Sequence, residues 1–436
     1  MKKQLFIWYF GVASATLFGQ SAERIPITRA TVLAKVVEQN KAIQIAEQDY
    51  IGARAELSQS NAIILPTLSV SHSAMVTTNP LMAFGSKLNQ EVLTASDFNP
   101  ALLNDPSQIQ NYATNITLEQ PLINVDGFYQ RQAAKLQMQA TKLQWDRSIE
   151  YIYLETNKAY MQLQLAHKAV AVMQQAVATA EANKNVAQDN VKAGYMQQAD
   201  FLSVEIQVNQ WKDQLSAAES NLENASDYLG YIINEPSTAV YVPSDSLSIQ
   251  LAETSSEKLS ENRSDVRAMQ MASVAYEKMH QSSKMSFLPR LNAFGSYQLY
   301  DDQIFSAGAD GYLLGAQLSW TIFEGAKRFG KVKQSGATSK KASLEYQQYI
   351  AKSQLELNHA RRELSDAENR FETAKLAKQQ AKEVLRIRSN RFKEGLEKTS
   401  DLLQAENQYA QKQLAYYQSM FTYNMAQSTL TFLTKD

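Results

Sequence analysis

The chain contains an internal duplication, and this feature limits the folds open to it more than any other. Residues 43–66, which end in Ile-Leu-Pro, match residues 266–289, which end in Phe-Leu-Pro, at a constant spacing of 223 residues. Gly194 and Gly395 open a second pair of matching motifs, at a spacing of 201 residues. The first copy therefore carries 22 additional residues between its Leu-Pro and its glycine. A repeat of this length predicts two similar structural halves.

Each copy contains a long stretch in which apolar residues recur every three to four positions. In residues 145–191, twelve of the fourteen positions reached in steps of four and three are apolar. When the same positions are shifted by 201 residues, eleven of the fourteen, in residues 346–392, are apolar. We call these the seam positions. A period of 3.5 residues over about seven heptads predicts long helices packed as a coiled coil. The polar exceptions are Thr156, Lys184, Ser353, Lys378 and Arg388.

Short segments of alternating polar and apolar residues precede each long helix. They are residues 67–76 and 111–122 in the first copy, and 291–300 and 312–322 in the second. A period of two over about ten residues is typical of transmembrane barrel strands, apolar toward lipid and polar toward the lumen. A small soluble β-domain is the alternative. The 22 additional residues fall in the loop 77–110, whose Asn-Pro and Asp-Pro pairs predict turns.

The N-terminus has the pattern of a secretory signal peptide. Two lysines precede an apolar run up to Phe18, and small residues follow from Gly19 to Ala22. We therefore expect residues 1–22 to be removed on export, with cleavage after Gly19 or Ala22. A single membrane anchor is the alternative, although the run is short and interrupted. No later stretch approaches the roughly 20 apolar residues of a membrane helix, so a later membrane crossing would require strands closed into a barrel.

These lengths and periods predict a mainly α fold with a β-barrel part. The first structural repeat, residues 23–235, is expected to hold a helix, two strands and a long helical hairpin. The second repeat is residues 263–436. Residues 236–262 between them are either a linker or a small equatorial element around the helices. Four strands per chain cannot close a barrel, since about eight are needed, but three chains would supply twelve.

The duplicated motifs resemble those of the TolC family of outer-membrane efflux proteins. They are Ile64-Leu65-Pro66 and Phe287-Leu288-Pro289 before the first strand of each copy, Gln120–Asn124 with its weak echo Trp320–Gly325, Arg263–Ala268, and Arg391–Glu406. The resemblance spans nearly all of the mature chain. It rests on the duplicated order and spacing of the motifs, because each motif alone has low specificity.

The resemblance implies a homotrimer in the cell outer membrane, with a twelve-stranded transmembrane barrel in contact with lipid and a long periplasmic α-barrel of antiparallel helices. The tip of the α-barrel would be closed at rest and would open when a periplasmic adaptor (membrane fusion protein) and an inner-membrane pump dock. The expected function is passive transport, as the exit duct of a tripartite efflux pump or a type I secretion system. Small molecules or a polypeptide would pass. A secreted periplasmic coiled-coil scaffold or adaptor is the alternative function.

The resemblance also assigns a periplasmic gate. Asp200 and Asp401 match acidic positions at the family's tip, where three-fold symmetry would form carboxylate rings that favour cations. The alternative is that each aspartate only caps a helix. Phe392 occupies a position where a gating aromatic residue is often found. Glu397 stands where the well-studied family member has a basic residue, so the salt-bridge latch of that member is not carried over.

The two glycines of the repeated motif are expected to reverse the chain at the hairpin tips, because glycine accepts unusual backbone angles. They and their neighbours are the predicted adaptor contacts: Lys192, Ala193, Gly194, Tyr195, Lys393, Glu394, Gly395 and Leu396.

Composition and motifs exclude several other classes of function. Forty-three basic and forty-four acidic residues give no basic excess for nucleic acid. The absence of cysteine excludes disulfides, thiolate metal sites and a lipidated cysteine. The four histidines have no metal-ligand spacing, and no nucleophile or phosphate-binding motif is present. We therefore predict no enzymatic activity, no metal and no cofactor.

Overall fold

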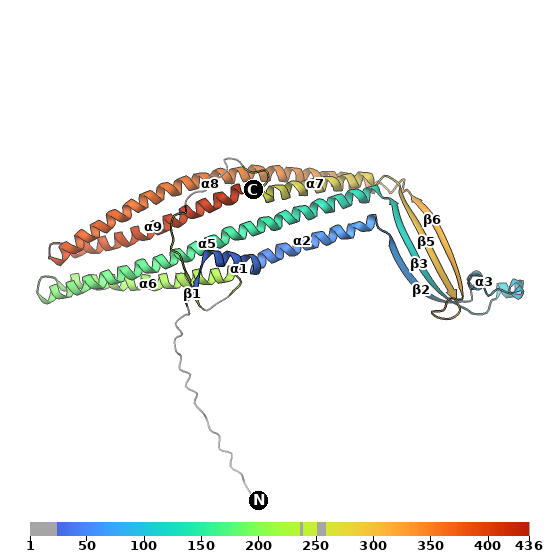
Figure 1. Ribbon diagram of the computed structural model, residues 1–436, viewed down its shortest axis with the longest axis horizontal. Coiled ribbons are helices and arrows are strands. Elements are labelled where there is room, and N and C mark those ends of the chain that lie inside the picture. Colours follow the sequence, from blue (N-terminus) through green and yellow to red (C-terminus); the bar gives the residue numbers. More distant parts are fainter. Residues whose placement is uncertain (1–23, 236–238, 251–258, 436) are drawn as a thin grey trace, which may run out of the picture. The chain divides into compact units, whose positions relative to one another are not determined.

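The computed structural model describes residues 24–235, 239–250 and 259–435 (Figure 1). The predicted signal peptide, residues 1–22, lies outside the described residues. The helices are α1 (Arg29–Gln39), α2 (Lys41–Gln59), η1 (Ser60–Ile63), α3 (Pro80–Asn89), η2 (Ala95–Phe98), α4 (Pro100–Asn104), α5 (Val125–Lys192), α6 (Gln198–Ile232), α7 (Ser264–Met285), α8 (Lys327–Lys393) and α9 (Thr399–Thr434). The strands are β1 (Arg24–Ile27), β2 (Thr67–Thr77), β3 (Ile109–Ile123), β4 (Val240–Pro243), β5 (Arg290–Asp301) and β6 (Ala309–Ser319).

The chain divides into two compact units. One, here the hairpin unit, comprises Met1–Lys41, Glu150–Ser255 and Asn358–Leu433. The other, here the sheet unit, comprises Ala42–Ile149, Ser256–Leu357 and Thr434–Asp436. Both predicted repeats contribute to both units. In the hairpin unit, short turns join α5 to α6 and α8 to α9, which forms two helical hairpins (Figure 1).

The long helices bury the stripe that the sequence predicts. All fourteen seam positions of α5, in residues 145–191, are buried or half-buried, and so are the fourteen of α8, in residues 346–392. The apolar period therefore marks the packed face of each helix. Among the described residues, no helix combines the length and apolar character needed to span a bilayer.

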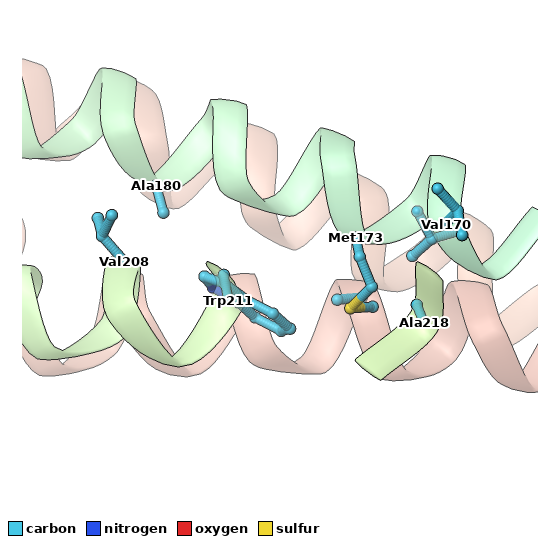
Figure 2. Packing of buried hydrophobic residues seen from close by; sticks show 8 residues of the cluster. Val170, Met173, Ala180, Val208, Trp211 and Ala218 are labelled. Atoms are coloured by element: carbon cyan, nitrogen blue, oxygen red, sulfur yellow. The ribbon is translucent and has the colours of Figure 1, made fainter. Parts of the chain in front are cut away.

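The hairpin unit packs around a buried tryptophan. Trp211 of α6 is 2% exposed and belongs to a buried cluster with side chains of α5, α6 and α9 (Figure 2). The cluster consists of Val170, Val172, Met173, Ala180, Val208, Trp211, Ala218 and Ala410. Alanine at three of these positions leaves room for the indole and lets the helices approach closely.

The helix expected before the first two strands is broken at Asn40, where φ is −66° and ψ is 124°. The Asn40 amide donates a hydrogen bond of 2.8 Å to the carbonyl of Ile232 at the end of α6. This bond supplies the donor that a carbonyl in the last turn of a helix lacks within its own helix. The break therefore ties α1 to the first hairpin.

A short parallel pair joins two segments that are distant in sequence. Arg24 pairs with Val240 and Ile27 with Pro243, so β1 and β4 form a two-stranded sheet. Part of the predicted linker is thus a structured element. Residues 236–238 and 251–258 of that linker lie outside the described residues.

The sheet unit contains an antiparallel sheet in the order β2-β3-β5-β6. The three strands predicted at 67–76, 111–122 and 291–300 are present. The fourth ends at Ser319, so residues 320–322 lie beyond it. One row across the sheet on one face is Val70, Ile116, Tyr297 and Tyr312. One row on the opposite face is Ser71, Asn115, Gln298 and Gly311. The sheet therefore has one mainly apolar face and one mainly polar face.

The loop at residues 77–110 contains helices that the sequence analysis did not predict. Asn79 accepts a hydrogen bond from the backbone of Met82, and Pro80 occupies the first turn of α3. Asn99 caps α4 in the same way, ahead of Pro100. Asn-Pro is thus a helix start in both cases, because proline needs no N–H partner there.

A buried charge network holds the start of α7 in the sheet unit. Arg263 is 1% exposed, and its Nε donates to Asp265 over 2.7 Å. Tyr349 donates to the other carboxylate oxygen over 2.6 Å, and Arg263 also donates to Ser353 over 2.8 Å. Burial raises the pKa of Asp265, but the hydrogen bonds from Arg263 and Tyr349 outweigh it, so the pKa is lowered overall.

Candidate functional site at the hairpin turns

The two hairpin turns have the same backbone geometry. Gly194 and Gly395 have φ angles of +79° and +73°, in the left-handed region that favours glycine. The amide of Gly194 donates to Val191 and that of Tyr195 donates to Asn190. After α8, the amides of Gly395 and Leu396 donate the equivalent hydrogen bonds. Both helices therefore end in a Schellman motif, which satisfies their last carbonyls and reverses the chain.

The two candidate gate aspartates have different surroundings. Asp200 is exposed and forms no ion pair with any described residue. Asp401 lies 3.2 Å from the Arg388 guanidinium. Each is the third residue of its helix, and the N-cap of α6 is Gln197. A carboxylate in the first turn is favourable for the helix dipole without capping the helix.

Glu397 is the centre of an ion-pair network that the sequence analysis missed. Its side chain is 6% exposed and accepts hydrogen bonds from Arg388 and from Arg391, the latter over 2.9 Å. Arg391 also donates to the carbonyl of Leu396 over 3.1 Å. The turn of the second hairpin is thus held by an acid between two arginines. Arg388 was visible in the sequence as a polar interruption of the seam.

Phe392, the predicted gating aromatic residue, is buried in the single chain. It is 2% exposed and belongs to a cluster with Ala187, Val204 and Leu402. A side chain packed in this way stabilises the two hairpins against each other. In the described chain, Phe392 is therefore a core residue of the tip.

A concave surface brings several predicted residues together. A cavity of about 900 Å³ is lined by residues of both turns. The predicted residues among them are Tyr195, Asp200, Phe392, Lys393, Glu394 and Gly395. The other predicted residues do not line it; they are Lys192, Ala193, Gly194, Leu396 and Asp401.

A second feature missed from the sequence is a buried acid between the hairpins. Glu406 is 5% exposed and accepts a hydrogen bond from the Asn183 amide. Burial raises the pKa of Glu406 to about 7, and the Asn183 bond offsets this only in part. Its counterpart in the first repeat, Glu205, instead pairs with Lys184 over 2.7 Å. The equivalent of Lys184 in the second repeat is Leu385, which leaves Glu406 without a matching lysine.

The contacts described above are ion pairs and hydrogen bonds. Among the residues named, no nucleophilic side chain is paired with a base. Among the described residues, no group of three or more His, Asp and Glu side chains is placed to hold a metal ion.

Comparison with known proteins identifies the family. The family model of outer membrane efflux proteins matches residues 32–235 and 256–434. The chain belongs to the outer membrane efflux protein family. Membership in this family makes the chain a transport protein rather than an enzyme. It also places the chain in the outer membrane, with a periplasmic helical domain. Outer membrane efflux proteins are exit ducts for efflux or secretion.

Solved structures have the same fold at low sequence identity. A membrane protein from Pseudomonas aeruginosa matches with a TM-score of 0.81 at 16% identity, over 93% of each chain. The CmeC outer membrane channel of Campylobacter jejuni matches with a TM-score of 0.77 at 15% identity, over 93% of this chain and 85% of that one. The open MtrE outer membrane channel of Neisseria gonorrhoeae gives 0.77 at 16% identity, over 93% and 88%. Among curated protein sequences, none matches this chain.

Proposed function

We propose that three copies of this outer membrane efflux protein close into a twelve-stranded barrel. The observation that carries the proposal is the open sheet. Its edge strands, β2 and β6, are eleven residues long. On its apolar face, Val70 is 65% exposed and Tyr312 is 78% exposed. Unpaired edges and an exposed apolar face are unfavourable in water. Pairing β6 of one copy with β2 of the next would satisfy the edges, and lipid would cover the apolar face.

The two halves of the chain, residues 23–235 and 263–436, are repeats derived from one unit. In the trimer, their helices form a periplasmic α-barrel that continues the duct. An adaptor docks at the turns that hold Gly194 and Gly395, and an inner-membrane pump supplies the energy. Small molecules or a polypeptide then pass unaltered.

Disulfide cross-linking tests the trimer, and the chain has no native cysteine to interfere. Ser71→Cys on β2 is combined with one cysteine at a time on the same face of β6. The β6 positions are Gly311, Leu313, Gly315 and Gln317. At least one combination should give cross-linked species that stop at the trimer in non-reducing gels. The control pairs Ser71→Cys with Leu314→Cys on the opposite face and should not cross-link. Absence of any cross-link, or a ladder beyond the trimer, would refute the closed barrel.

Single-channel conductance in a planar bilayer tests the gate. Among the described residues no cation pairs with Asp200, whereas Arg388 pairs with Asp401. We therefore expect Asp200→Ala to reduce cation selectivity more than Asp401→Ala. Asp213→Ala, an exposed acid further along α6, is the matched control. If both gate variants behave like this control, the aspartates serve only their helices. If folded wild-type protein never conducts, the duct itself is refuted.

A further inference from the structure

The long loop between β2 and β3 encloses a cavity of its own. The cavity has a volume of about 370 Å³, and its lining comes from α3, η2, α4 and the chain that leads into β3. This volume lies within the range of small-molecule sites. The second copy connects β5 to β6 without the 22 additional residues. The cavity therefore belongs to a part of the chain that the duplicated fold does not require, and long ordered loops of this kind usually carry a function.

Polar and aromatic contacts fix the walls of this loop cavity. Lys87 of α3 donates to Asp97 of η2 over 2.7 Å, and the ring centres of Phe84 and Phe98 lie 5.7 Å apart in an edge-on arrangement. Gln90 at the end of α3 is 7% exposed and donates to backbone carbonyls of β3 and β5 over 2.9 and 3.2 Å. The walls are thus held in the single chain, so a ligand would not have to order them.

Most of the cavity lining is apolar. Burying an apolar lining against the apolar body of a ligand is favourable, because both surfaces leave water. Phe84 adds an aromatic ring that can pack against a ring of the ligand. The apolar lining residues are Pro80, Ala83, Phe84, Leu102, Leu103 and Pro106.

The charged groups of the lining leave one negative charge unbalanced. Lys87 and Asp97 neutralise each other, and Asp97 also accepts hydrogen bonds from the amide and the hydroxyl of Thr94, each over 2.8 Å. The bonds from Lys87 and Thr94 lower the pKa of Asp97 to about 2, so this acid stays ionised. Asp105 is exposed, and its carboxylate has no ion-pair or hydrogen-bond partner among the described residues. Charge complementarity therefore favours an occupant with one positive charge.

We propose that the loop cavity binds a small organic cation, with an apolar or aromatic body against the apolar lining and a single ammonium group at Asp105. An inorganic cation would leave the apolar lining uncovered, and an anion would meet the unpaired carboxylate. Long loops of the proposed barrel lie on the extracellular side, so the ligand would come from outside the cell. Only this direction of approach rests on the proposed function, because the site itself needs neither a second copy of the chain nor an open duct.

Dansylcadaverine, a fluorescent naphthalene sulfonamide with an alkyl ammonium group, tests the site on the purified full chain. Its N-acetylated form keeps the fluorophore and loses the charge. Both probes are titrated at one detergent concentration, so that their partition into micelles is the same for all proteins compared. The variant Asp105→Asn should weaken binding of the ammonium probe about threefold, as expected for one exposed ion pair, and should leave the acetylated probe unaffected. Raising the salt concentration should weaken binding of the ammonium probe only.

Two further variants locate the probe. Glu91→Gln is the matched control for charge, because Glu91 is an exposed acid of the same loop that does not line the cavity. It should leave binding of both probes unchanged. Ser107→Phe fills the cavity from an exposed position and should weaken both probes about tenfold or more. In the wild type, the bound ammonium probe should slow amide hydrogen exchange within residues 80–107.

Three results would overturn the inference. Equal losses in Asp105→Asn and Glu91→Gln would mean that only net charge attracts the probe. Unchanged binding in Ser107→Phe would place the probe elsewhere on the protein, and so would unchanged hydrogen exchange of residues 80–107 at saturating probe. None of these results affects the proposed duct, whose own test is conductance. Protein that binds the probe as expected but never conducts would refute the duct and leave the loop site intact.

Discussion

Glu406 should make the stability of the hairpin tip depend on pH near neutrality. Its Oε1 accepts from Asn183, while its Oε2 and the indole Nε1 of Trp211 have no hydrogen-bond partner among the described residues. Both side chains line one small cavity of about 20 Å³, together with the half-buried Tyr409. Burial raises the pKa from 4.5 to about 7. An ionised Glu406 is therefore unfavourable in the folded tip.

The size and sign of the effect follow from this shift. The folded tip keeps the proton on Glu406 between the unfolded pKa, 4.5, and the folded pKa, about 7. The unfolded chain has already lost it in this range. Stability therefore falls as pH rises from 4.5 to about 7 and stays low above that. One pKa unit corresponds to about 1.4 kcal/mol, so the full penalty is about 3 kcal/mol.

The variant Glu406→Gln removes the ionisable group and keeps the shape. We expect it to stabilise the tip by up to about 3 kcal/mol at pH 8 and by almost nothing at pH 4.5. Glu205→Gln is the matched control, because this counterpart pairs with Lys184 and is only partly buried. It should lose a few tenths of a kcal/mol and gain no stability as pH rises.

Hydrogen exchange of residues 180–187 and 402–410 measures local opening of the tip at each pH, after correction for the intrinsic exchange rate. Trp211 offers a second readout, since its fluorescence in a background with Trp8→Phe, Trp145→Phe and Trp320→Phe reports from the cavity that Glu406 lines. If the wild type and Glu406→Gln change in parallel between pH 5 and 8, the buried acid is not the titrating group and the reasoning fails.

Three further predictions concern backbone and buried polar groups. Gly194→Ala and Gly395→Ala should each cost about 1 kcal/mol, seen as faster exchange of the turn amides. No atom lies within 4 Å of the added Cβ, so a much larger cost would contradict a purely backbone origin. Asn40→Ala should cost about 1–3 kcal/mol in thermal unfolding, because a buried carbonyl loses its donor; an unchanged midpoint would argue against the bond. Asp265→Asn should cost about 3 kcal/mol or more, because it leaves the buried Arg263 charge without its carboxylate. Since the pKa of Asp265 is lowered, its contribution is present at neutral pH and is lost as pH falls below 3.8. The variant should therefore show a smaller acid-induced fall in midpoint than the wild type.

The sequence predicted the helices well because their signal is local and repeated. The seam positions of α5 and α8 recur over many turns, so a few polar residues do not obscure them. The strands were also predicted. The predicted end of the fourth strand lies three residues beyond the end of β6, because the alternation of polar and apolar residues continues past Ser319 while the strand pairing does not.

The features that the sequence analysis missed depend on contacts between distant residues. The break at Asn40 requires the carbonyl of Ile232, and β1 requires β4, so neither has a local signal. The Asn-Pro pairs of the long loop are ambiguous, since the same pair serves turns and helix starts. The gating role of Phe392 stays a prediction from the resemblance, and its seam position agrees with its burial in the single chain.

The polar interruptions of the seam were the overlooked signal for polar sites. Lys184, Ser353, Lys378 and Arg388 each occupy a position that is otherwise apolar. In the structure Lys184 pairs with Glu205, and Ser353 accepts a hydrogen bond from Arg263. Lys378 lies against two tyrosine rings, and Arg388 pairs with Glu397. A polar residue on a packed face needs a partner. Such interruptions therefore indicate where tertiary polar contacts form, but not with which residue.

The parallel pairing of β1 with β4 has a consequence for how the chain matures. Arg24 precedes its partner Val240 in the chain, and the whole first hairpin lies between them. Closing so long a loop is slow, because its ends must meet before any contact compensates for the lost chain entropy. We therefore expect β1 to stay unpaired until the first hairpin has followed it. During this interval its free backbone N–H and C=O groups are open to a chaperone that binds extended segments.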